Sequence, residues 1–441
     1  MQEGVKMKQF KLLVILMVLF FATNMFAQTW TAQTNPITGR DINSGFAVDT
    51  NICFMCGATT SQTLGYVIRT TNGGTTWTNI TGSMPTSTVG LYTVTATSAL
   101  NVWTGASDGS LYHTTDGGTT WTYVSLPTPA TAFIDVVHFY NANTGFVVGD
   151  PQSSVWCYYW TTNAGVNWNF GPSPSAGANE AGWNNSYFTL DTAHIWFGSN
   201  FSKVYKGTLR GGFTSGTTST YNSFGLAFCN ANSGVATMVL GAPPTPTTVS
   251  SNNVTTNGGT TWTAGYTPAG IQYNIKAVPG FPYMWSSGAG ATGGVILFSS
   301  NYGVNWTSQF TSTQIVYVLA LANVNRGWAG TATGLIYKYQ GILSEVNNNN
   351  TSVPQNYKLE QNFPNPFNPT TTINYSVPKT SFVTLKVYDV LGNEVMSVVN
   401  EQQTANNYTY TLDFSKLSSG VYYYTLRAGD FSSTKKLMLV K

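Results

Sequence analysis

The sequence is poor in charge. Asp, Glu, Lys and Arg make up 8% of its 441 residues, against about 25% in an ordinary soluble domain. The formal net charge is +3, and three of the lysines, Lys6, Lys8 and Lys11, lie in the first eleven residues. No basic patch of the kind that binds phosphate backbones is visible, so the sequence argues against a nucleic-acid partner.

Cysteine and histidine are also scarce, with 4 and 3 residues. Cys53 and Cys56 have the CxxC spacing of redox and metal sites. They lie in a strand-like run, however, where positions i and i+3 point to opposite faces. No second CxxC pair and no nearby histidine completes a zinc set. We therefore expect no metal and no cofactor. Cys53, Cys56, Cys157 and Cys229 are expected to be buried free thiols or to form one structural disulfide.

Only one long apolar run occurs, from Leu12 to Phe21. Lysines precede it and small residues up to Ala27 follow it, which is the order of a secretory signal peptide. The run is too short to cross the ~30 Å core of a bilayer as a helix, and no later segment reaches about 18 apolar residues. We predict a Sec signal peptide over residues 1–27 and no transmembrane helix after its removal.

Aromatic and small polar residues are abundant: 14% of the chain is aromatic, and there are 44 glycines. Threonine and aromatic residues favour pleated, half-buried surfaces, so we expect an all-β fold. Residues 358–441 are richer in charge than residues 28–340, and an Asn-rich stretch closed by proline separates them. This shift predicts two domains, 28–340 and 358–441, joined by a linker over 341–357.

An octapeptide recurs through the first domain. It reads TTNGGTTW at 70–77 and returns with small changes at 114–121, 161–168, 255–262 and 299–306. The tryptophans that end these copies lie 44, 47, 94 and 44 positions apart. Because 94 is two periods of 47, a copy is expected in between, and TLRGGFTS at 208–215 is a degenerate one.

A second signature counts the repeats. Each contains an apolar strand with an aromatic residue or valine, at Phe46, Trp103, Phe146, Trp196, Val235, Trp285 and Trp328. The last repeat ends without an octapeptide, whereas Thr29-Trp30-Thr31 matches the end of one. A period of 44–47 residues fits four short strands, and a ring of such sheets must close to leave no open edge. We predict a seven-bladed β-propeller over residues 28–340, closed by the N-terminal strand.

The octapeptide resembles the Asp-box, or BNR, repeat of sialidases, xyloglucan-type glycosidases and photosystem II assembly-factor propellers. The resemblance implies that each box lies in the hairpin between the third and fourth strands of a blade. Glycine there permits positive φ, Asn or Asp caps the turn, and Trp packs between blades. The structural residues are Asn72 and Trp77, Asp116 and Trp121, Asn163 and Trp168, Asn257 and Trp262, and Asn301 and Trp306. Four boxes carry Asn where Asp is usual, which argues against a cation-binding role.

The C-terminal domain shows the alternation of a strand at 383–388 and turn residues at 391–393 and 418–420, which predicts a small β-sandwich. It also resembles the type A C-terminal sorting domain of type IX (Por) secretion over its whole length. The matching residues are Pro364, Asn365, Pro366, Phe367, Asn368, Pro369, Asp389, Gly392, Gly420, Lys435 and Lys436. The resemblance implies a partner in the type IX machinery and delivery to the outer-membrane surface or outside of a bacterium of the Bacteroidota or a related group. An accessory fibronectin-like module is the alternative.

Catalysis by the propeller would need a recognisable set of side chains. A sialidase needs three arginines that converge on the substrate carboxylate. Only Arg40 and Arg326 lie away from the boxes, and two arginines cannot supply that set. A glycosidase needs two carboxylates flanking the scissile bond. The candidates on the face opposite the boxes are Asp108, Asp135, Asp150 and Glu180. Each can equally be a turn cap or a solvated loop carboxylate, so no catalytic set is assigned.

Aromatic residues are the other candidates, because sugar rings stack on Trp and Tyr. Trp183 and Tyr187 flank the longest inter-blade loop, and Trp156 lies in an aromatic strand. Core packing is the competing interpretation, with Trp183 expected to be the best exposed. We expect a secreted or surface propeller that binds polysaccharide or a surface protein without catalysis. An extracellular glycoside hydrolase and a scaffold for assembling surface proteins are the alternatives.

Overall fold

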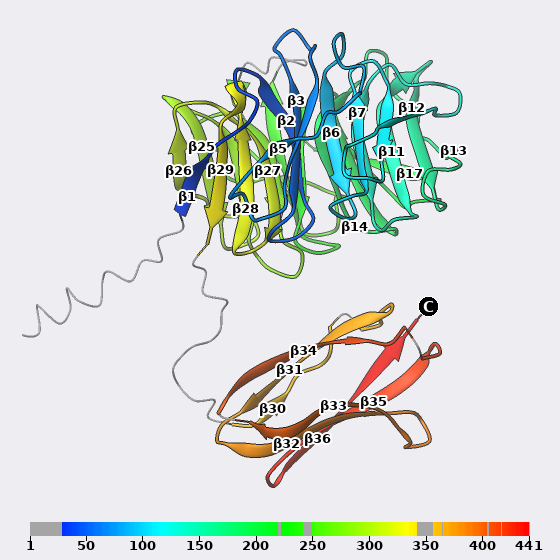
Figure 1. Ribbon diagram of the computed structural model, residues 1–441, viewed down its shortest axis with the longest axis vertical. Helices are drawn as coiled ribbons and strands as arrows, with labels where there is room; N and C mark the ends of the chain where they lie inside the picture. Colours follow the sequence, from blue (N-terminus) through cyan, green and yellow to red (C-terminus); the bar gives the residue numbers. More distant parts are fainter. Residues whose placement is uncertain are drawn as a thin grey trace, which may run out of the picture. The chain divides into compact units, whose positions relative to one another are not determined.

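The computed structural model describes residues 29–218, 222–240, 248–249, 251–341, 356–363, 365–403, 405–415 and 417–440. These residues form two compact units, one up to residue 341 and one from residue 356. Their regular structure is β-strand except for a short 3-10 helix, η1 (Ala332–Gly334) (Figure 1). The predicted signal peptide, most of the predicted linker and Pro364 lie outside the described residues.

In the first unit the described strands form seven antiparallel sheets. The first sheet contains β2 (Asp41–Ala47), β3 (Cys53–Ala58), β4 (Tyr66–Thr70) and β5 (Thr78–Asn79). The second contains β6 (Leu91–Ala96), β7 (Val102–Ala106), β8 (Leu111–Thr114) and β9 (Thr122–Val124). The third contains β10 (Ile134–Phe139), β11 (Gly145–Gln152), β12 (Val155–Thr161) and β13 (Asn169–Phe170).

The next three sheets follow the same order along the chain. They are β14 (Gly182–Asp191), β15 (His194–Ser199), β16 (Lys203–Gly207) and β17 (Phe213–Thr217); β18 (Asn222–Phe228), β19 (Gly234–Leu240), β21 (Asn253–Thr255) and β22 (Thr263–Ala264), with β20 (Thr248–Val249) beside β19; and β23 (Gln272–Ala277), β24 (Met284–Gly290), β25 (Gly293–Ser299) and β26 (Thr307–Ser312).

The last sheet joins the two ends of the unit. It contains β27 (Val316–Asn323), β28 (Arg326–Thr331), β29 (Ile336–Gln340) and, as its outer strand, β1 (Thr29–Gln33). β1 pairs antiparallel with β29 from Thr29 opposite Gln340 to Gln33 opposite Ile336. The prediction that the N-terminal strand completes the last sheet is therefore confirmed.

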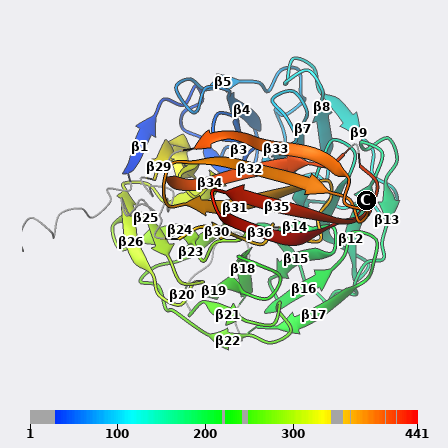
Figure 2. The same ribbon diagram turned by 90° about the horizontal axis from the view of Figure 1, so that it is seen from below.

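One edge strand of each sheet, here called the inner strand, lies at the centre of a ring; the inner strands are β2, β6, β10, β14, β18, β23 and β27. Each inner strand contacts the next one along the chain, and β27 contacts β2. Figure 2 shows the strands of the first unit arranged in a circle. The inner strands all begin on one face of the ring, called the loop face. The hairpins between third and fourth strands lie on the opposite face, called the box face. The predicted all-β propeller is confirmed.

Each octapeptide forms the hairpin between the third and fourth strands of its sheet. In the copy between β4 and β5, Asn72 Oδ1 accepts the Thr76 N–H at 2.9 Å, and the Thr70 hydroxyl accepts the Gly74 N–H at 2.8 Å. In the copy between β8 and β9, Asp116 Oδ1 accepts the Thr120 N–H at 2.9 Å. Asn and Asp thus make the same turn.

The tryptophans of the octapeptides reach the preceding sheet. The ring of Trp168 packs edge-to-face on Trp103 with centroids 5.9 Å apart, and Trp77 does the same to Trp328 at 6.4 Å. Trp121 Nε1 donates to the Ile80 carbonyl of the previous sheet at 2.9 Å. These contacts join neighbouring sheets, as the resemblance of the octapeptides implies.

The four cysteines are free and buried. Cys53 and Cys56 belong to different clusters of the core, on the two faces of β3. This is the arrangement expected for positions i and i+3 of a strand. Burial raises the pKa of the Cys229 thiol to about 12 and that of Cys53 well above its ordinary value. Thiols in this state are poor nucleophiles.

The second unit is a small sandwich of two sheets. One contains β30 (Lys358–Leu359), β31 (Thr370–Val377) and β34 (Asn406–Asp413); the other contains β33 (Glu394–Gln403), β32 (Ser381–Tyr388), β35 (Gly420–Ala428) and β36 (Phe431–Leu439). Val383, Leu385 and Val387 alternate along β32 and are buried in the shared core. The period-two pattern predicted this strand correctly.

Candidate functional site

The inner strands share a β-bulge close to the loop face. In β6, for example, Leu91 pairs with Ala106 and Thr93 with Gly105, so Tyr92 is an extra residue. Five of the other inner strands have the same one-residue shift, and β14 has a larger one. A bulge re-aims the side chain that it carries. The bulged residues of the other single bulges are Asn43, Asp135, Phe224, Tyr273 and Tyr317.

Four bulge residues on consecutive inner strands form a row that we call the aromatic arc: Trp183, Phe224, Tyr273 and Tyr317. Their neighbouring rings meet edge-to-face, with centroids 4.3, 5.4 and 5.1 Å apart. Phe224, Tyr273 and Tyr317 are half-buried, whereas Trp183 is 5% exposed. The arc therefore presents partly exposed rings at the loop-face end of the central channel.

Tyrosine hydroxyls add polarity to this surface. Within the described chain, the hydroxyls of Tyr92, Tyr273 and Tyr317 make no hydrogen bond and are not sealed from solvent. Burial, followed by the charge of Asp41, raises the pKa of Tyr92 and Tyr317 to about 12. These groups therefore remain protonated at neutral pH and are available as donors to a ligand.

Asn185 crosses the central channel just below the arc. It lies in the expanded bulge of β14, where residues 183–186 interrupt the pairing with β15. Its side-chain amide donates to the carbonyls of Asn43 and Tyr92 at 3.1 Å each, and its oxygen accepts the Ser44 hydroxyl at 2.9 Å. One side chain thus ties β14 to β2 and β6 and separates the two ends of the channel.

Two of the predicted carboxylates come together on the loop face. Asp135 is the bulge residue of β10 and is 4% exposed, and its carboxyl packs against Gly182, where a Cβ would come within 2.3 Å. Asp150, near the end of β11, accepts the Gly182 N–H at 2.8 Å. Burial, and then the charge of Asp150, raise the pKa of Asp135, and burial raises that of Asp150. Such a pair can hold a proton at neutral pH.

The other two predicted carboxylates have structural partners. Asp108 is exposed and accepts the Ser110 N–H at 3.0 Å in the β7–β8 turn. The Glu180 carboxylate is buried and accepts from Lys203 Nζ at 2.9 Å, the Tyr205 hydroxyl at 2.8 Å and the Gly177 N–H at 2.7 Å. Burial alone would raise the pKa of Glu180, but these donors outweigh it and the pKa is lowered. Glu180 fixes the loop before β14.

The three predicted ligand-binding aromatics are buried, which corrects the expectation of an exposed Trp183. Trp183 is 5% exposed because the expanded bulge of β14 packs it on Phe224. Trp156 is 0% exposed and packs between Phe197 and Tyr205 inside the propeller. Tyr187 is 9% exposed and lines the box-face end of the channel. Half-buried Phe224, Tyr273 and Tyr317 were missed, although an alignment of the repeats places an aromatic at each of these bulges.

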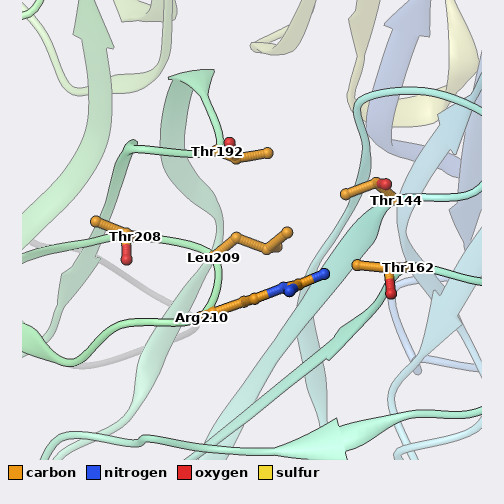
Figure 3. A pocket seen from close by; sticks show the side chains of 6 residues that line it. All are labelled: Thr144, Thr162, Thr192, Thr208, Leu209 and Arg210. Atoms are coloured by element: carbon orange, nitrogen blue, oxygen red, sulfur yellow. The ribbon is translucent and has the colours of Figure 1, made fainter. Parts of the chain in front are cut away.

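A separate cavity of about 350 Å³ opens on the box face, between the third and fourth sheets. Figure 3 shows Arg210 extending across it toward Thr162, with Leu209 and Thr192 above. Arg210 occupies the Asn or Asp position of the degenerate octapeptide, and its guanidinium lies 5.2 Å from the Trp160 ring centroid. Arginine donors over an aromatic ring can meet a carboxylate or sulfate.

Among the described residues, no group of three or more His, Cys, Asp or Glu side chains is placed to hold a metal ion. The candidates for contact with a ligand are the aromatic arc, the Asp135–Asp150 pair, Arg210 and the residues of the channel.

The motif of the second unit fastens its N-terminal segment to its last strand. Asn365 Oδ1 accepts the Met438 N–H at 2.9 Å, and Phe367 pairs in parallel with Leu439 and packs on Phe414. Asp389 accepts the N–H groups of Leu391 and Asn393 in a turn where Gly392 has φ 85°. Pro366, Asn368 and Lys436 are exposed.

The chain ends in a secretion system C-terminal sorting domain. Residues 361–441 match this family. The domain directs export through the type IX secretion system to the cell surface or the extracellular space. In the part of the chain that the structure describes, we find no helix with the length and apolarity required to cross a membrane.

The first unit is similar to solved propellers. A structure of YCF48 bound to D1 peptide has 15% identity and a TM-score of 0.55, covering 70% of this chain and 96% of the other. YCF48 from Cyanidioschyzon merolae has 15% identity and a TM-score of 0.52, covering 70% and 98%. The match to the Niastella koreensis GH74 enzyme extends beyond the first unit, with 14% identity and a TM-score of 0.51, covering 94% of this chain and 75% of the other. These similarities show the fold. No curated protein matches the chain.

Proposed function

We propose that the propeller is a non-catalytic module that binds polysaccharide outside the cell, at the loop-face end of its central channel. The observation that carries this proposal is the aromatic arc. It places three half-buried rings side by side, and two of them end in hydroxyls without a partner in the described chain. Aromatic faces stack on the C–H faces of sugars, and hydroxyl donors meet sugar oxygens.

The charge of the propeller is consistent with a neutral glycan as ligand. Residues 28–340 contain eight basic and eight acidic side chains, so their formal net charge is zero. Such a surface has little means of attracting a strongly charged partner at long range. Stacking and hydrogen bonds remain as the source of affinity.

The test is retention of the purified, exported protein on a panel of neutral polysaccharides. We expect Tyr273→Ala and Tyr317→Ala each to weaken retention at least tenfold, because each removes a ring and a hydroxyl. Tyr123→Ala is the matched control, because Tyr123 is 59% exposed on β9. Equal retention of the arc variants and the wild type would refute the assignment of the surface. A wild type that binds no polysaccharide would refute the ligand class and direct the search to protein partners.

A second candidate function, glycoside hydrolysis, is favoured by the Asp135–Asp150 pair alone. A protonated carboxyl beside an ionised one is the arrangement in which one acts as acid and the other as base or nucleophile. Burial of Asp135 beneath Gly182 opposes direct contact with a substrate. Release of reducing ends by the wild type and its loss in Asp150→Asn would support hydrolysis over binding.

A further inference from the structure

The box-face end of the central channel holds a cavity of its own. Its volume is about 130 Å³, which is room for a few water-sized groups. Phe46, Phe188 and Leu321 contribute apolar walls, and His138, Tyr187, Thr189 and Lys276 contribute the polar groups. Asn185 crosses the channel on the loop-face side, so the cavity lies at the opposite end from the aromatic arc.

Lys276 is a cation without an anionic partner in this cavity. It projects from β23, and its Nζ lies 5.6 Å from the centroid of the Tyr187 ring. The ion pairs among the described residues involve other lysines and a histidine, and none includes Lys276. An ammonium partly removed from water costs free energy unless it is paired. A cation–π contact of this kind offsets only about 0.5–2 kcal/mol of that cost.

The other polar groups of the cavity do not supply a negative charge. His138 Nδ1 lies 3.4 Å from the Tyr187 hydroxyl. Burial, and then the positive charge of Lys276, lower the pKa of His138 to about 3, so its ring is neutral at pH 7. Burial lowers the pKa of Lys276 to about 8, which leaves the ammonium the main form at neutral pH. The lining residues of β2 and β27 are apolar or glycine.

From this geometry we infer that the box-face end of the channel is a binding site for a small organic carboxylate, with Lys276 as its counter-ion. The carboxylate would meet the Lys276 ammonium beside the Tyr187 hydroxyl, while Phe46, Phe188 and Leu321 would contact the apolar part of the ligand. A single lysine acts as a point charge and is matched by one negative charge. The apolar walls favour an organic acid over a strongly hydrated inorganic anion. The ligand is either a short acid or the acidic end of a longer molecule entering from the open side.

The experiment is calorimetric titration of the full-length exported protein with benzoate and acetate at pH 7, with benzyl alcohol as the neutral probe. We expect binding of benzoate to the wild type and a loss of affinity of at least tenfold in Lys276→Met. Lys206→Met is the matched control, because Lys206 Nζ also lies over an aromatic ring, 5.7 Å from the centroid of Trp196, but outside this cavity. It should bind benzoate within twofold of the wild type.

Lys276→Met is expected to fold, because it replaces a poorly hydrated ammonium by an apolar side chain of similar length. Its melting temperature, measured without ligand, should equal or exceed that of the wild type. The inference is overturned if the wild type binds neither carboxylate, if benzyl alcohol binds as tightly as benzoate, or if folded Lys276→Met binds benzoate like the wild type. The arc variants Tyr273→Ala and Tyr317→Ala should retain benzoate binding, so this site and the proposed polysaccharide site are tested separately.

Discussion

The octapeptides differ in which residue occupies a turn position with positive φ. At the first of their two glycine positions φ is positive in the five well-conserved copies, for example 68° at Gly73 and 69° at Gly258. Two copies have a side chain there, Ala164 at 58° and Tyr302 at 60°. A non-glycine residue in this region costs about 1–2 kcal/mol. These two turns are therefore held by their hydrogen bonds and packing against a local preference.

Replacing Ala164 by glycine should stabilise the protein by up to about 1 kcal/mol. The relief of backbone strain exceeds the extra conformational entropy that glycine gives the unfolded chain, about 0.4–1 kcal/mol. Denaturant unfolding of the full-length protein measures the change. Gly73→Ala, the reverse substitution at the equivalent position, should destabilise; an unchanged or lower stability of Ala164→Gly would contradict the argument.

Asp135 should make stability depend on pH. Its pKa is raised in the folded protein, by burial and then by Asp150, above the ordinary value of 3.8. A group of this kind stabilises the folded state fully below its unfolded pKa, and the contribution is lost as the pH rises toward the folded pKa. We expect Asp135→Asn to melt at a higher temperature than the wild type at pH 7, and the difference to shrink below pH 4.

Melting curves between pH 3 and pH 8 test this expectation. Asp108→Asn is the control, because its exposed turn can be capped by asparagine as well as by aspartate. A wild type more stable than Asp135→Asn at pH 7 would show that ionised Asp135 has a partner that offsets its burial.

At the scale of strands and hairpins, the sequence predicts the elements that recur in each repeat but does not predict the irregularities within them. The octapeptides, the closing strand and the alternation of β32 follow from local patterns. The bulges do not, because one extra residue reverses the alternation that assigns each side chain to a face. Trp183 illustrates the point: its place beside the longest inter-blade loop predicts exposure, whereas the bulge of β14 packs it on Phe224. The crossing of the channel by Asn185 joins residues up to 142 positions apart and leaves no local signal.

The hairpin between β32 and β33 should be an export contact of the sorting domain. Val390 and Leu391 at its tip are 66% and 83% exposed, on a turn held by Asp389. Exposed apolar side chains on a fixed turn contribute little to folding and suit recognition by a partner. We expect the double variant Val390→Asp/Leu391→Asp to keep its melting temperature while less protein reaches the cell surface.

Protease accessibility on intact cells measures this surface fraction. Phe382→Asp is the control, because Phe382 is 60% exposed in the same unit but lies outside this tip. Normal display of the double variant would exclude the tip as a contact.

At the scale of the whole propeller, stability depends on its N-terminal strand. Trp30 in β1 is 8% exposed, donates from Nε1 to Gln309 at 3.0 Å and packs on Tyr339 with centroids 5.0 Å apart. Chain ends usually tolerate substitution because they are frayed. Here we expect Trp30→Ala to destabilise by about 3–5 kcal/mol, as for a core tryptophan.

Equilibrium unfolding compares this variant with Thr29→Ala, the exposed neighbour. Thr29→Ala should change stability by less than about 0.5 kcal/mol, as surface substitutions usually do. A similarly small effect of Trp30→Ala would mean that the ring does not need its closing strand.

The closing strand also sets an order of events. Thr29 pairs with Gln340, 311 positions later, so the pair of strands that seals the ring contains the first and the last parts of the propeller to be synthesised. Contacts this distant in sequence form slowly, because the chain must lose the conformational entropy of a long loop before the contacts stabilise it. A chain that is made and handled from its N-terminus onward therefore stays an open ring until residue 340 has emerged. Any machinery that must keep the propeller unfolded during transit could act by holding β1 apart from β29.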